Sequence, residues 1–457
     1  MLANFEIPND WKLANITPIF KKGKKCDANN YRPISLTSII CKILERIVKS
    51  NLVHYIEENK LIENTQHGFR KNRSCLTNLL EYIDFVSSEL DKGNSVDVVY
   101  LDFSKAFDRV PHDDLIGKLH NYGIGGSILS WIKQWLNGRK QRVILNGYKS
   151  EWSDVISGVP QGSVLGPLLF ILFMNDMDSL TTSRLFKFAD DCKVAKSISN
   201  VQDHFKLQND LDRLEGWADK WGMKFNSKKC SVLNFGNNNS HFGYSLNGKW
   251  LESRETEKDL GVIVDNQLKF REQCIEVRNK ANRILGFINK NVSYKSKYVI
   301  KSLYNSYVRP HIEYCIQAWK PYLRHDINML ESVQRRATKL IPEIRHKQYS
   351  ERLKILDMFP IEYRLLRGDL IETYKLLHNI DKIDTVDFFR RRTDTRTRGH
   401  SFTLEKSLAH KDIRKFSFSY RVINDWNALP EHVVGSENLE VFKKRLDQHM
   451  IENSDFP

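Results

Sequence analysis

Residues 96–108 read VDVVYLDFSKAFD, and this stretch decides the fold. From Val96 to Phe103 nearly every residue is apolar and β-favouring, which predicts a central strand covered on both faces. Asp102 interrupts the run close to its end. A carboxylate there either leaves the sheet at the strand terminus or is buried, and burial without a partner or a metal ion is too costly to expect. Asp102 is therefore the first candidate functional residue.

A second pair of strands is predicted at residues 185–188 and 192–198, where β-favouring residues flank a short connection. The connection contains Ala189, Asp190 and Asp191. We therefore expect a hairpin that presents two acids.

A turn-rich loop, SGVPQGS at residues 157–163, lies between the first strand and this hairpin. An almost uniformly apolar helix is expected after it, around residues 167–173. Apolar spacing predicts further elements: helices over 37–62, 76–93 and 330–341, and short strands at 244–246 and 260–264. This mixture predicts an α+β fold with a domain boundary near Gly236.

The composition points to a polyanionic partner. Lysine and arginine number 71 and aspartate and glutamate 56, so the 457-residue chain has a formal net charge of +15. Such a charge attracts nucleic acid or an acidic membrane, but it does not name the partner by itself. The longest apolar run, about residues 164–174, is shorter than the roughly 18 residues that suggest a membrane span, and residues 1–12 lack the pattern of a secretory signal. We expect an intracellular protein without a membrane partner.

The seven cysteines are scattered along the chain without the spacing of a zinc finger. An odd number of widely spaced cysteines also argues against a secreted disulfide scaffold. We expect reduced thiols.

Three acids at neighbouring strand ends fit one kind of chemistry. Nucleotidyl transfer uses two hard cations to activate a hydroxyl and to stabilise the leaving pyrophosphate, and carboxylates are preferred ligands of such ions. Asp102, followed 88 residues later by adjacent Asp190 and Asp191, is the arrangement that a palm-type polymerase requires. An Asp-Asp pair in a turn is by itself more often solvated, so the flanking sequence decides.

The flanking sequence resembles three motifs of reverse transcriptases, in the order that those enzymes have. Residues 98–108, VVYLDFSKAFD, resemble the strand motif with the first catalytic aspartate. Residues 158–163, GVPQGS, resemble the loop that packs against nucleotide and template, and residues 188–191, FADD, resemble the aspartate hairpin. Further blocks resemble the non-LTR (LINE-type) retrotransposon branch, particularly the Jockey and CR1-like elements: WK at 11–12, IFKKG at 19–23, NYRPISL at 30–36, HGFR at 67–70, NSKKC at 226–230, QRRA at 334–337 and WNALP at 426–430.

This resemblance implies a right-hand polymerase with fingers, a palm of antiparallel sheet plus helices, a helical thumb and a mostly helical C-terminal region. The expected division is fingers at 1–95, palm with the catalytic motifs at 96–236, end of the palm and thumb at 237–330, and a helical basic region at 331–457. The implied activity is RNA-directed DNA polymerisation, with an RNA template, a DNA primer and deoxynucleoside triphosphates (dNTPs) as partners.

The resemblance also implies the ligands of the metal ions. Asp102, Asp190 and Asp191 would bind two Mg²⁺ ions, for which Mn²⁺ can substitute, and the backbone of Phe103 would touch a metal-bound phosphate. Four nearby residues are left out because helix-start and turn hydrogen bonding explains them: Asp108, His112, Asp113 and Asp114.

Nucleotide binding is expected from residues around the aspartates. Phe107 matches the aromatic steric gate that would clash with a ribose 2′-hydroxyl, and a core aromatic is the alternative. Gln161 and Gly162 would position template and nucleotide, because glycine lets the backbone approach closely. Arg32 and Lys229 complete the set, since transferring phosphoryl groups need fixed cations.

Contacts with template or primer are expected from six basic residues: Lys21, Lys22, Arg70, Arg335, Arg336 and Arg391. Arg391 follows Phe388 and Phe389, a composition that phosphate tracking with base stacking would use. A solvated lysine loop around Lys21 and a flexible charged loop around Arg391 are the alternatives.

Other functions stay open at this point. The chain begins almost directly at the first fingers block and carries no recognisable endonuclease, so insertion into a target would need a separate endonuclease. An inactive or domesticated remnant that binds nucleic acid is the main alternative. A group II intron maturase-like protein fits the distal blocks less well, and Phe107 argues against a viral RNA polymerase. Function in the nucleus is expected, although no targeting signal is evident.

Overall fold

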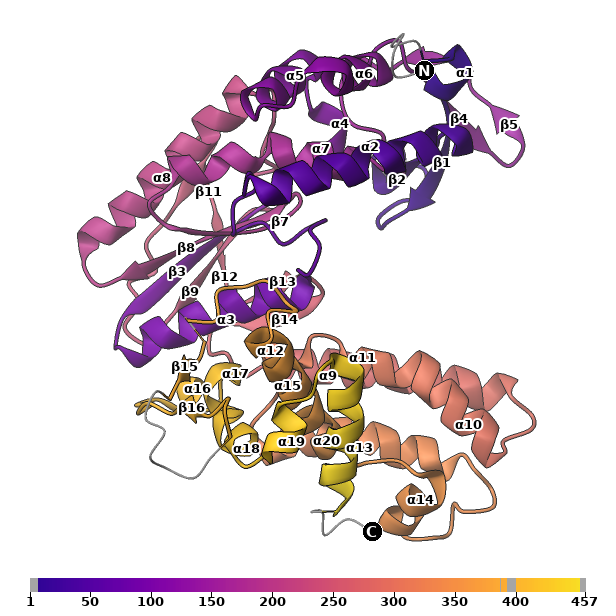
Figure 1. Ribbon diagram of the computed structural model, residues 1–457, viewed down its shortest axis with the longest axis vertical. Helices are drawn as coiled ribbons and strands as arrows, with labels where there is room; N and C mark the ends of the chain where they lie inside the picture. Colours follow the sequence, from indigo (N-terminus) through magenta and orange to yellow (C-terminus); the bar gives the residue numbers. More distant parts are fainter. Residues whose placement is uncertain (1–6, 387, 393–399, 453–457) are drawn as a thin grey trace.

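The computed structural model describes residues 7–386, 388–392 and 400–452 (Figure 1). Helices and sheets are both well represented, so the predicted α+β class is confirmed. A central five-stranded sheet has the order β12-β9-β3-β8-β7. Its strands are β3 (Ser95–Leu101), β7 (Arg184–Phe188), β8 (Asp191–Ile198), β9 (Ser231–Phe235) and β12 (Glu252–Arg254). β8 and β9 lie on either side of β3, and both run antiparallel to it.

The other strands form a second sheet and several hairpins. The second sheet has the order β2-β1-β4-β5, with β6 paired to β4, and β1 runs parallel to β4. Its strands are β1 (Leu13–Phe20), β2 (Tyr31–Leu36), β4 (Lys140–Leu145), β5 (Tyr148–Lys149) and β6 (Ser153–Asp154). The hairpins are β10 (Ser245–Leu246) with β11 (Lys249–Trp250), β13 (Thr256–Asp259) with β14 (Val262–Asp265), and β15 (Arg390–Arg391) with β16 (Leu404–Glu405).

Helices cover the sheets and form most of the C-terminal half. The longer ones are α2 (Ile39–Glu58), α3 (Cys75–Asp91), α5 (His112–Asn121), α6 (Gly126–Leu136), α7 (Gly166–Phe173), α8 (Val201–Lys220), α9 (Arg271–Asn291), α13 (Arg324–Lys339), α14 (Tyr349–Leu356), α15 (Ile361–Leu377) and α20 (Leu439–Glu452). The shorter ones are α1 (Asn9–Lys12), η1 (Ala28–Asn30), α4 (Ala106–Arg109), η2 (Asn175–Leu180), α10 (Lys297–Leu303), η3 (Tyr304–Val308), α11 (Arg309–Glu313), α12 (Ile316–Trp319), α16 (Asp412–Lys415), α17 (Phe418–Arg421), α18 (Ile423–Asn427) and α19 (Glu431–Val434).

The predicted helices over 37–62, 76–93, 167–173 and 330–341 are confirmed as α2, α3, α7 and α13. In the residues that the structure describes, no helix combines the length and the apolar character needed to cross a membrane.

β3 is covered on both faces, which explains its almost unbroken apolar sequence. Val96 and Val98 join a core with α3 and the C-terminal helices. Val99 and Leu101 join a second core with α7 and α8. The strand ends at Leu101, slightly earlier than predicted, and Asp102 emerges just beyond it.

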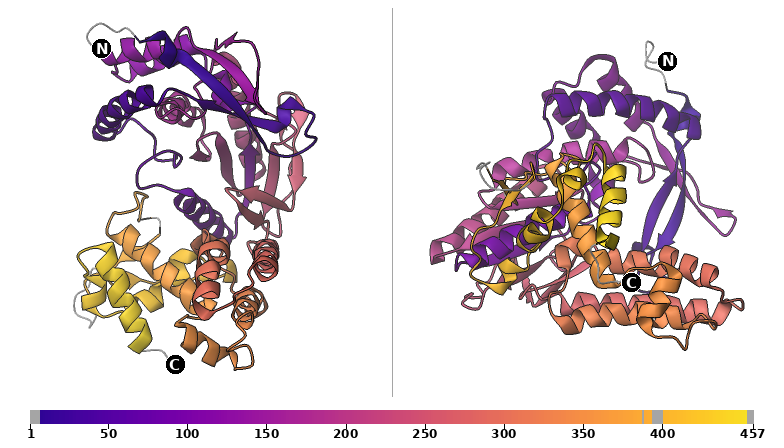
Figure 2. Two further views of the ribbon diagram at one scale, coloured as in Figure 1. Left: turned by 90° about the vertical axis from the view of Figure 1, so that its right-hand side faces the viewer. Right: turned by 60° about the horizontal axis from the view of Figure 1, so that its bottom comes forward.

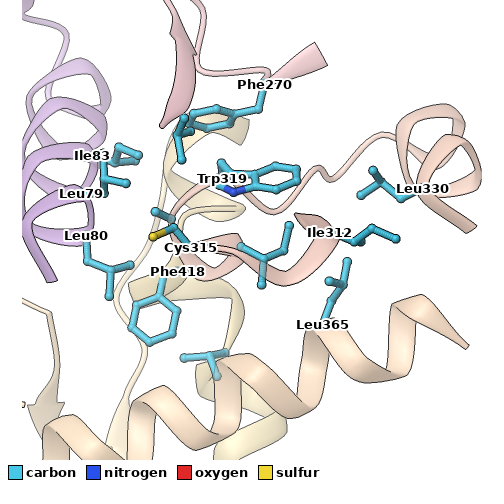
Figure 3. Packing of buried hydrophobic residues seen from close by; sticks show 14 of the residues in the cluster. Leu79, Leu80, Ile83, Phe270, Ile312, Cys315, Trp319, Leu330, Leu365 and Phe418 are labelled. Atoms are coloured by element: carbon cyan, nitrogen blue, oxygen red, sulfur yellow. The ribbon is translucent and has the colours of Figure 1, made fainter. Parts of the chain in front are cut away.

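The C-terminal helices form a lobe below the central sheet, and the two termini lie at opposite ends of the molecule (Figures 1 and 2). Figure 3 shows Leu79, Leu80 and Ile83 of α3 facing the same apolar cluster as Trp319 and Phe418 of this lobe. α3 therefore packs on the central sheet and on the lower lobe at once.

A buried carboxylate, Glu45 of α2, connects three helices near the SGVPQGS loop. Its Oε2 accepts hydrogen bonds from the backbone N–H groups of Val164 and Leu165 at 2.6 and 3.1 Å, just before α7 begins. Its Oε1 accepts a hydrogen bond from Trp135 Nε1 of α6 at 3.2 Å. The negative charge satisfies amides that have no partner within α7. Glu45 thereby fixes the helix that follows the loop.

Replacing Glu45 by alanine would leave these three buried donors without a partner. We expect Glu45→Ala to lower the free energy of unfolding by at least about 3 kcal/mol, because each unsatisfied donor of the three costs about 1–3 kcal/mol. Chemical denaturation followed by circular dichroism measures this loss. Glu58→Ala on the same helix is the control, since the Glu58 side chain is 62% exposed, and it should change stability by less than about 0.5 kcal/mol. Unchanged stability of Glu45→Ala would contradict the role given to Glu45.

Candidate active site

Strand register places Asp102 beside the aspartate hairpin. β3 pairs with β8 so that Leu101 lies opposite Cys192. Because the strands are antiparallel, Asp102 at the end of β3 comes next to Asp191 at the start of β8. Two acids that are 89 residues apart in sequence are thus brought together by the backbone ladder of the central sheet.

The predicted hairpin is confirmed and has a two-residue turn. Phe188 of β7 pairs with Asp191 of β8, and Ala189 and Asp190 connect them. Ala189 has a φ of +58°, a left-handed conformation that residues other than glycine rarely adopt. Surrounding contacts must therefore hold the turn in this shape.

Gln66 and the first residues of the HGFR block supply those contacts. Gln66 Oε1 accepts hydrogen bonds from the backbone N–H groups of Gly68 at 2.8 Å and Ala189 at 3.0 Å. The N–H of His67 donates to the carbonyl of Lys187 at 2.8 Å. A Cβ at position 68 would lie 2.5 Å from the Ala189 nitrogen, so only glycine fits. Gln66 was not identified from the sequence. The one signal that could have pointed to it was its position directly before the HGFR block.

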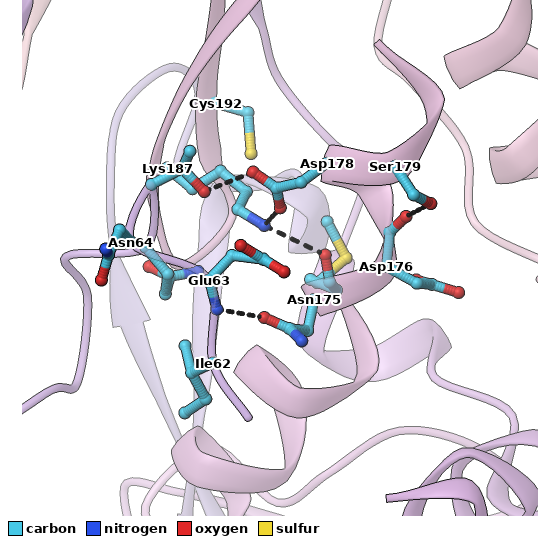
Figure 4. Close-up of polar contacts among 12 residues, drawn as sticks. Ile62, Glu63, Asn64, Asn175, Asp176, Asp178, Ser179, Lys187 and Cys192 are labelled. Carbon is cyan, nitrogen blue, oxygen red and sulfur yellow. Dashed lines mark hydrogen bonds and ion pairs between the residues drawn. The ribbon is translucent and has the colours of Figure 1, made fainter. Parts of the chain in front are cut away.

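Polar contacts of Lys187, close to the hairpin turn in sequence, fasten β7 to η2 (Figure 4). The fully buried ammonium of Lys187 pairs with the carboxylate of Asp178. Asn175 Oδ1 accepts a hydrogen bond from the backbone N–H of Glu63 at 2.9 Å. Lys187 and Asn175 thus find polar partners that connect the strand before the turn, η2 and the segment at Glu63.

The three aspartates repel one another electrostatically. Burial raises the pKa of Asp190, and the charge of Asp102 raises it further. Burial also raises the pKa of Asp191 to about 6, with contributions from the charges of Asp190, Asp259 and Asp102. In the part of the chain that the structure describes, no three His, Cys, Asp or Glu side chains stand close enough together to hold a metal ion as they are. The three carboxylates nevertheless concentrate negative charge at one end of the central sheet.

Three basic side chains that were predicted to bind nucleotide or nucleic acid lie around these acids. The Lys229 ammonium is 2.9 Å from Oδ2 and 3.2 Å from Oδ1 of Asp102. Lys21 interacts electrostatically with Arg32, Lys229, Asp190 and Asp102. Burial lowers the pKa of Lys21, and the charges of Arg32 and Lys229 lower it further. The structure therefore brings Lys21, Arg32 and Lys229 to the aspartates.

A cavity of about 120 Å³ opens beside Asp102 and Asp191. Its walls come from the ends of β3, β7 and β8, from α3 and from the β13–β14 hairpin. Two residues that sequence reasoning missed, Lys193 and Asp259, also line it. Neither residue gave a sequence signal, because charged residues are common in short strands and nothing near either position marks the two as partners.

The GVPQGS loop is held against β2 and α4. Gln161 donates from Nε2 to Asp108 Oδ1 at 2.9 Å, and its carbonyl accepts from the N–H of Ser35 at 2.7 Å. Gly162 has a φ of +124°, and a Cβ there would lie 2.5 Å from the Ser35 carbonyl oxygen. One carboxylate oxygen of Asp108 is therefore bound by the loop.

The two phenylalanines of the first motif differ in their surroundings. Phe103 is buried and stacks on Phe225 with ring centroids 4.3 Å apart, so only its backbone could reach a site. Phe107 is partly buried and stacks on Phe170 at 4.2 Å, with the edge of Phe69 at 6.2 Å. These contacts fix the orientation of the Phe107 ring.

Two of the predicted nucleic-acid contacts, Lys22 and Arg70, lie in the N-terminal part of the chain. Lys22 is exposed. Arg70 is largely buried, and its Nη1 donates to the carbonyls of Glu63 at 2.9 Å and Ile62 at 3.4 Å. Arg70 therefore binds its own loop in this structure.

The remaining predicted contacts, Arg335, Arg336 and Arg391, lie in the lower lobe and are not brought to the aspartates. Their guanidinium groups bind within the lobe: Arg335 lies over the Tyr349 ring at 4.2 Å, Arg336 donates to Asn282 at 3.0 Å and Arg391 donates to the Leu377 carbonyl at 3.0 Å. The expected base stacking on Phe388 and Phe389 is wrong, because both rings are buried in the core of the lobe.

Comparison with known proteins identifies the family. A sequence profile described as "Reverse transcriptase (RNA-dependent DNA polymerase)" matches residues 19–288. The RNA-directed DNA polymerase from mobile element jockey of Drosophila melanogaster is 29% identical over 348 residues, which are 73% of this chain and 38% of the relative. The counterpart from Drosophila funebris is 30% identical with the same coverage. The chain thus spans about 38% of the length of these curated relatives.

Among solved structures, apo telomerase from Candida tropicalis matches with a TM-score of 0.45 and 10% identity, over 84% of this chain and 69% of that chain. The resemblance to Jockey-like elements is confirmed by the two curated relatives. Because the profile match covers more than half of the sequence and includes Asp102, Asp190 and Asp191, the chain belongs to the reverse transcriptase (RNA-dependent DNA polymerase) family.

Proposed function

We propose that this chain is the polymerase part of a non-LTR retrotransposon protein, and that it copies RNA into DNA by extending a DNA primer with dNTPs. The observation that carries the proposal is the register of β3 and β8, which sets Asp102 beside the hairpin of Asp190 and Asp191. Membership of the reverse transcriptase family supports it.

The chemistry of the aspartate site fits divalent cations. Carboxylates offer the oxygen ligands that Mg²⁺ prefers, and Mn²⁺ accepts the same ligands. Mutual repulsion contributes to the raised pKa values of Asp190 and Asp191, and a cation would relieve it. Asp102, Asp190 and Asp191 would hold two ions, with the backbone of Phe103 nearby, once Lys229 releases Asp102 and turns to the nucleotide. The ions would supply charge stabilisation for the attacking hydroxyl and the leaving pyrophosphate.

Side chains of the chain itself would handle the nucleotide. Lys21 and Arg32 provide fixed positive charge beside the aspartates, where it would neutralise a triphosphate. Gln161 and Gly162 would support template and nucleotide, because their loop is fastened to β2 and α4. Phe107 would exclude a 2′-hydroxyl, since its ring is held in place by stacking.

We also propose the nucleic-acid contacts, the division into domains and the cellular setting. Lys22, Arg70, Arg335, Arg336 and Arg391 remain candidates for contacts with template or primer. We retain the division into fingers, palm, thumb and C-terminal basic region. Insertion into a genome would take place in the nucleus and would need an endonuclease activity besides this polymerase site.

The Asp190→Asn variant tests the mechanism, because it removes one carboxylate charge at nearly constant size. We expect the parent chain to extend a DNA primer on an RNA template with dNTPs and Mg²⁺, and chelation by EDTA to stop the reaction. Asp190→Asn should slow extension by at least about 1,000-fold, since a metal ligand contributes several kcal/mol to the transition state. Asp113→Asn, at an exposed position in the first turn of α5, is the control and should retain the parent rate.

Two results would overturn this proposal. Extension by Asp190→Asn at the parent rate would reject the assigned site. A parent chain that binds primer and template in a gel-shift assay without extending the primer would favour the domesticated remnant.

The Phe107→Ala variant tests the steric gate. Removing the ring would open space for a 2′-hydroxyl, so we expect the ratio of ribonucleotide to deoxynucleotide incorporation to rise by at least about tenfold. Single-nucleotide extension with each triphosphate measures kcat/KM for both. Phe205→Ala on α8, whose parent ring is 59% exposed, serves as the control. If Phe107→Ala discriminates between ribonucleotides and deoxynucleotides as well as the parent does, Phe107 is a core aromatic without a gating role.

A further inference from the structure

A buried lysine lies next to the aspartate site without a part in the mechanism above. Lys193 is two residues after Asp191 on β8, so both side chains point to the same face of the sheet. The Lys193 side chain is 2% exposed. Burial of an ammonium is costly unless partners compensate for it, and such a group therefore marks a specific arrangement.

The partners of Lys193 come from two distant segments. Its ammonium donates to Asn78 Oδ1 of α3 at 2.8 Å and pairs with the buried carboxylate of Asp259 at the end of β13. The ring of Tyr82 covers it at 4.4 Å. Lys193 therefore ties the β13–β14 hairpin and α3 to the strand that carries Asp191.

The tip of the β13–β14 hairpin has a backbone conformation that leucine rarely adopts. Asp259 pairs with Val262, and Leu260 and Gly261 connect them with φ values of +46° and +88°. Positive φ at both central residues is typical of a type I′ turn, where leucine is disfavoured. The Tyr314 hydroxyl donates to the Leu260 carbonyl at 3.0 Å. The tip is thus clamped on one side by Tyr314 and on the other by Lys193.

This clamped tip forms one wall of the cavity beside the aspartates. Residues 257–260 line the cavity of about 120 Å³, together with Asp102, Asp191 and Lys193. A shift of the hairpin would therefore change the space in which the reacting groups meet. Misplacement by about 1 Å can slow an enzymatic reaction roughly 100-fold.

We propose that Lys193 is a positioning residue for primer extension: it fastens the β13–β14 hairpin to β8 and so fixes the cavity wall that faces Asp102 and Asp191. The proposal rests on the proposed polymerase function. Lys193 acts through the hairpin and touches neither nucleotide nor primer. Its loss should therefore lower kcat and leave the KM for dNTPs nearly unchanged, since Lys21 and Arg32 are left in place.

Hydrogen exchange of the full chain tests the fastening directly and does not depend on activity. We expect the amides of residues 256–265 to exchange at least about tenfold faster in Lys193→Met than in the parent, while those of α2 stay unchanged. Lys196→Met is the matched control, because Lys196 lies on the same strand with its side chain on the opposite face. Unchanged exchange of the hairpin in Lys193→Met would overturn the proposal.

A double variant separates positioning from simple stabilisation. Lys193→Met leaves Asp259 buried without its partner and should lower the melting temperature. Lys193→Met/Asp259→Met removes both charges and should restore much of that loss, because apolar residues often replace a buried ion pair without net cost. We expect kcat to stay at least about tenfold below the parent value in both variants, with the KM for dNTPs within about twofold. Recovery of kcat together with stability in the double variant would overturn the proposal.

The parent chain distinguishes failure of this proposal from failure of the proposed function. No extension by the parent would reject the polymerase function and, with it, the positioning role of Lys193 in primer extension. Normal extension by the parent and by Lys193→Met would reject the role of Lys193 alone.

Discussion

The pairing of β3 with β8 is the constraint on which the candidate site depends. A slip of one residue in this ladder would exchange the two faces of β3 and separate Asp102 from Asp191. The register is fixed by burial, because Val98 faces the core shared with the lower lobe and Val99 faces the core of α7 and α8. The apolar residues that form the sheet therefore also place the acids.

Buried polar groups determine how the neighbouring segments meet this sheet. Glu45 binds the start of α7, Gln66 binds the aspartate turn and Lys193 binds the β13–β14 hairpin. Apolar packing has little directional preference, whereas a buried donor or acceptor is costly without its partner. Each of these residues thus selects one arrangement of a loop or hairpin over others with similar apolar burial.

The sequence allowed the framework of the site to be predicted, because its signals are local. A nearly continuous apolar run predicted β3, β-favouring residues around a short connection predicted the β7–β8 hairpin, and helical spacing predicted the main helices. The flanking motifs, which resemble those of reverse transcriptases, singled out Asp102, Asp190 and Asp191. The connecting residues could not be found in this way. Gln66 and Lys193 act on partners more than 60 residues away in the chain, and the pattern of one segment does not reveal the other.

Because a local pattern does not reveal distant partners, the prediction that Phe388 and Phe389 stack on bases was wrong. Phe388 and Phe389 precede a basic run, and composition alone makes them equally suited to stack on bases or to pack in a core. Their burial follows from the helices that surround them, including Phe418 against Phe389 at a centroid distance of 5.8 Å. The local sequence shows which residue types are present, but only the tertiary fold determines which of them are exposed.

The charges around the aspartates also account for how an acidic site can belong to a chain with a net charge of +15. At long range, the excess of lysine and arginine attracts polyanions. At short range, three carboxylates alone would repel a phosphate, but Lys21, Arg32 and Lys229 stand among or beside them. Because Coulomb energies fall with distance and with solvent screening, these nearby cations dominate what an approaching phosphate meets. The site thus combines acidic side chains with nearby basic ones, within a chain whose net charge is positive.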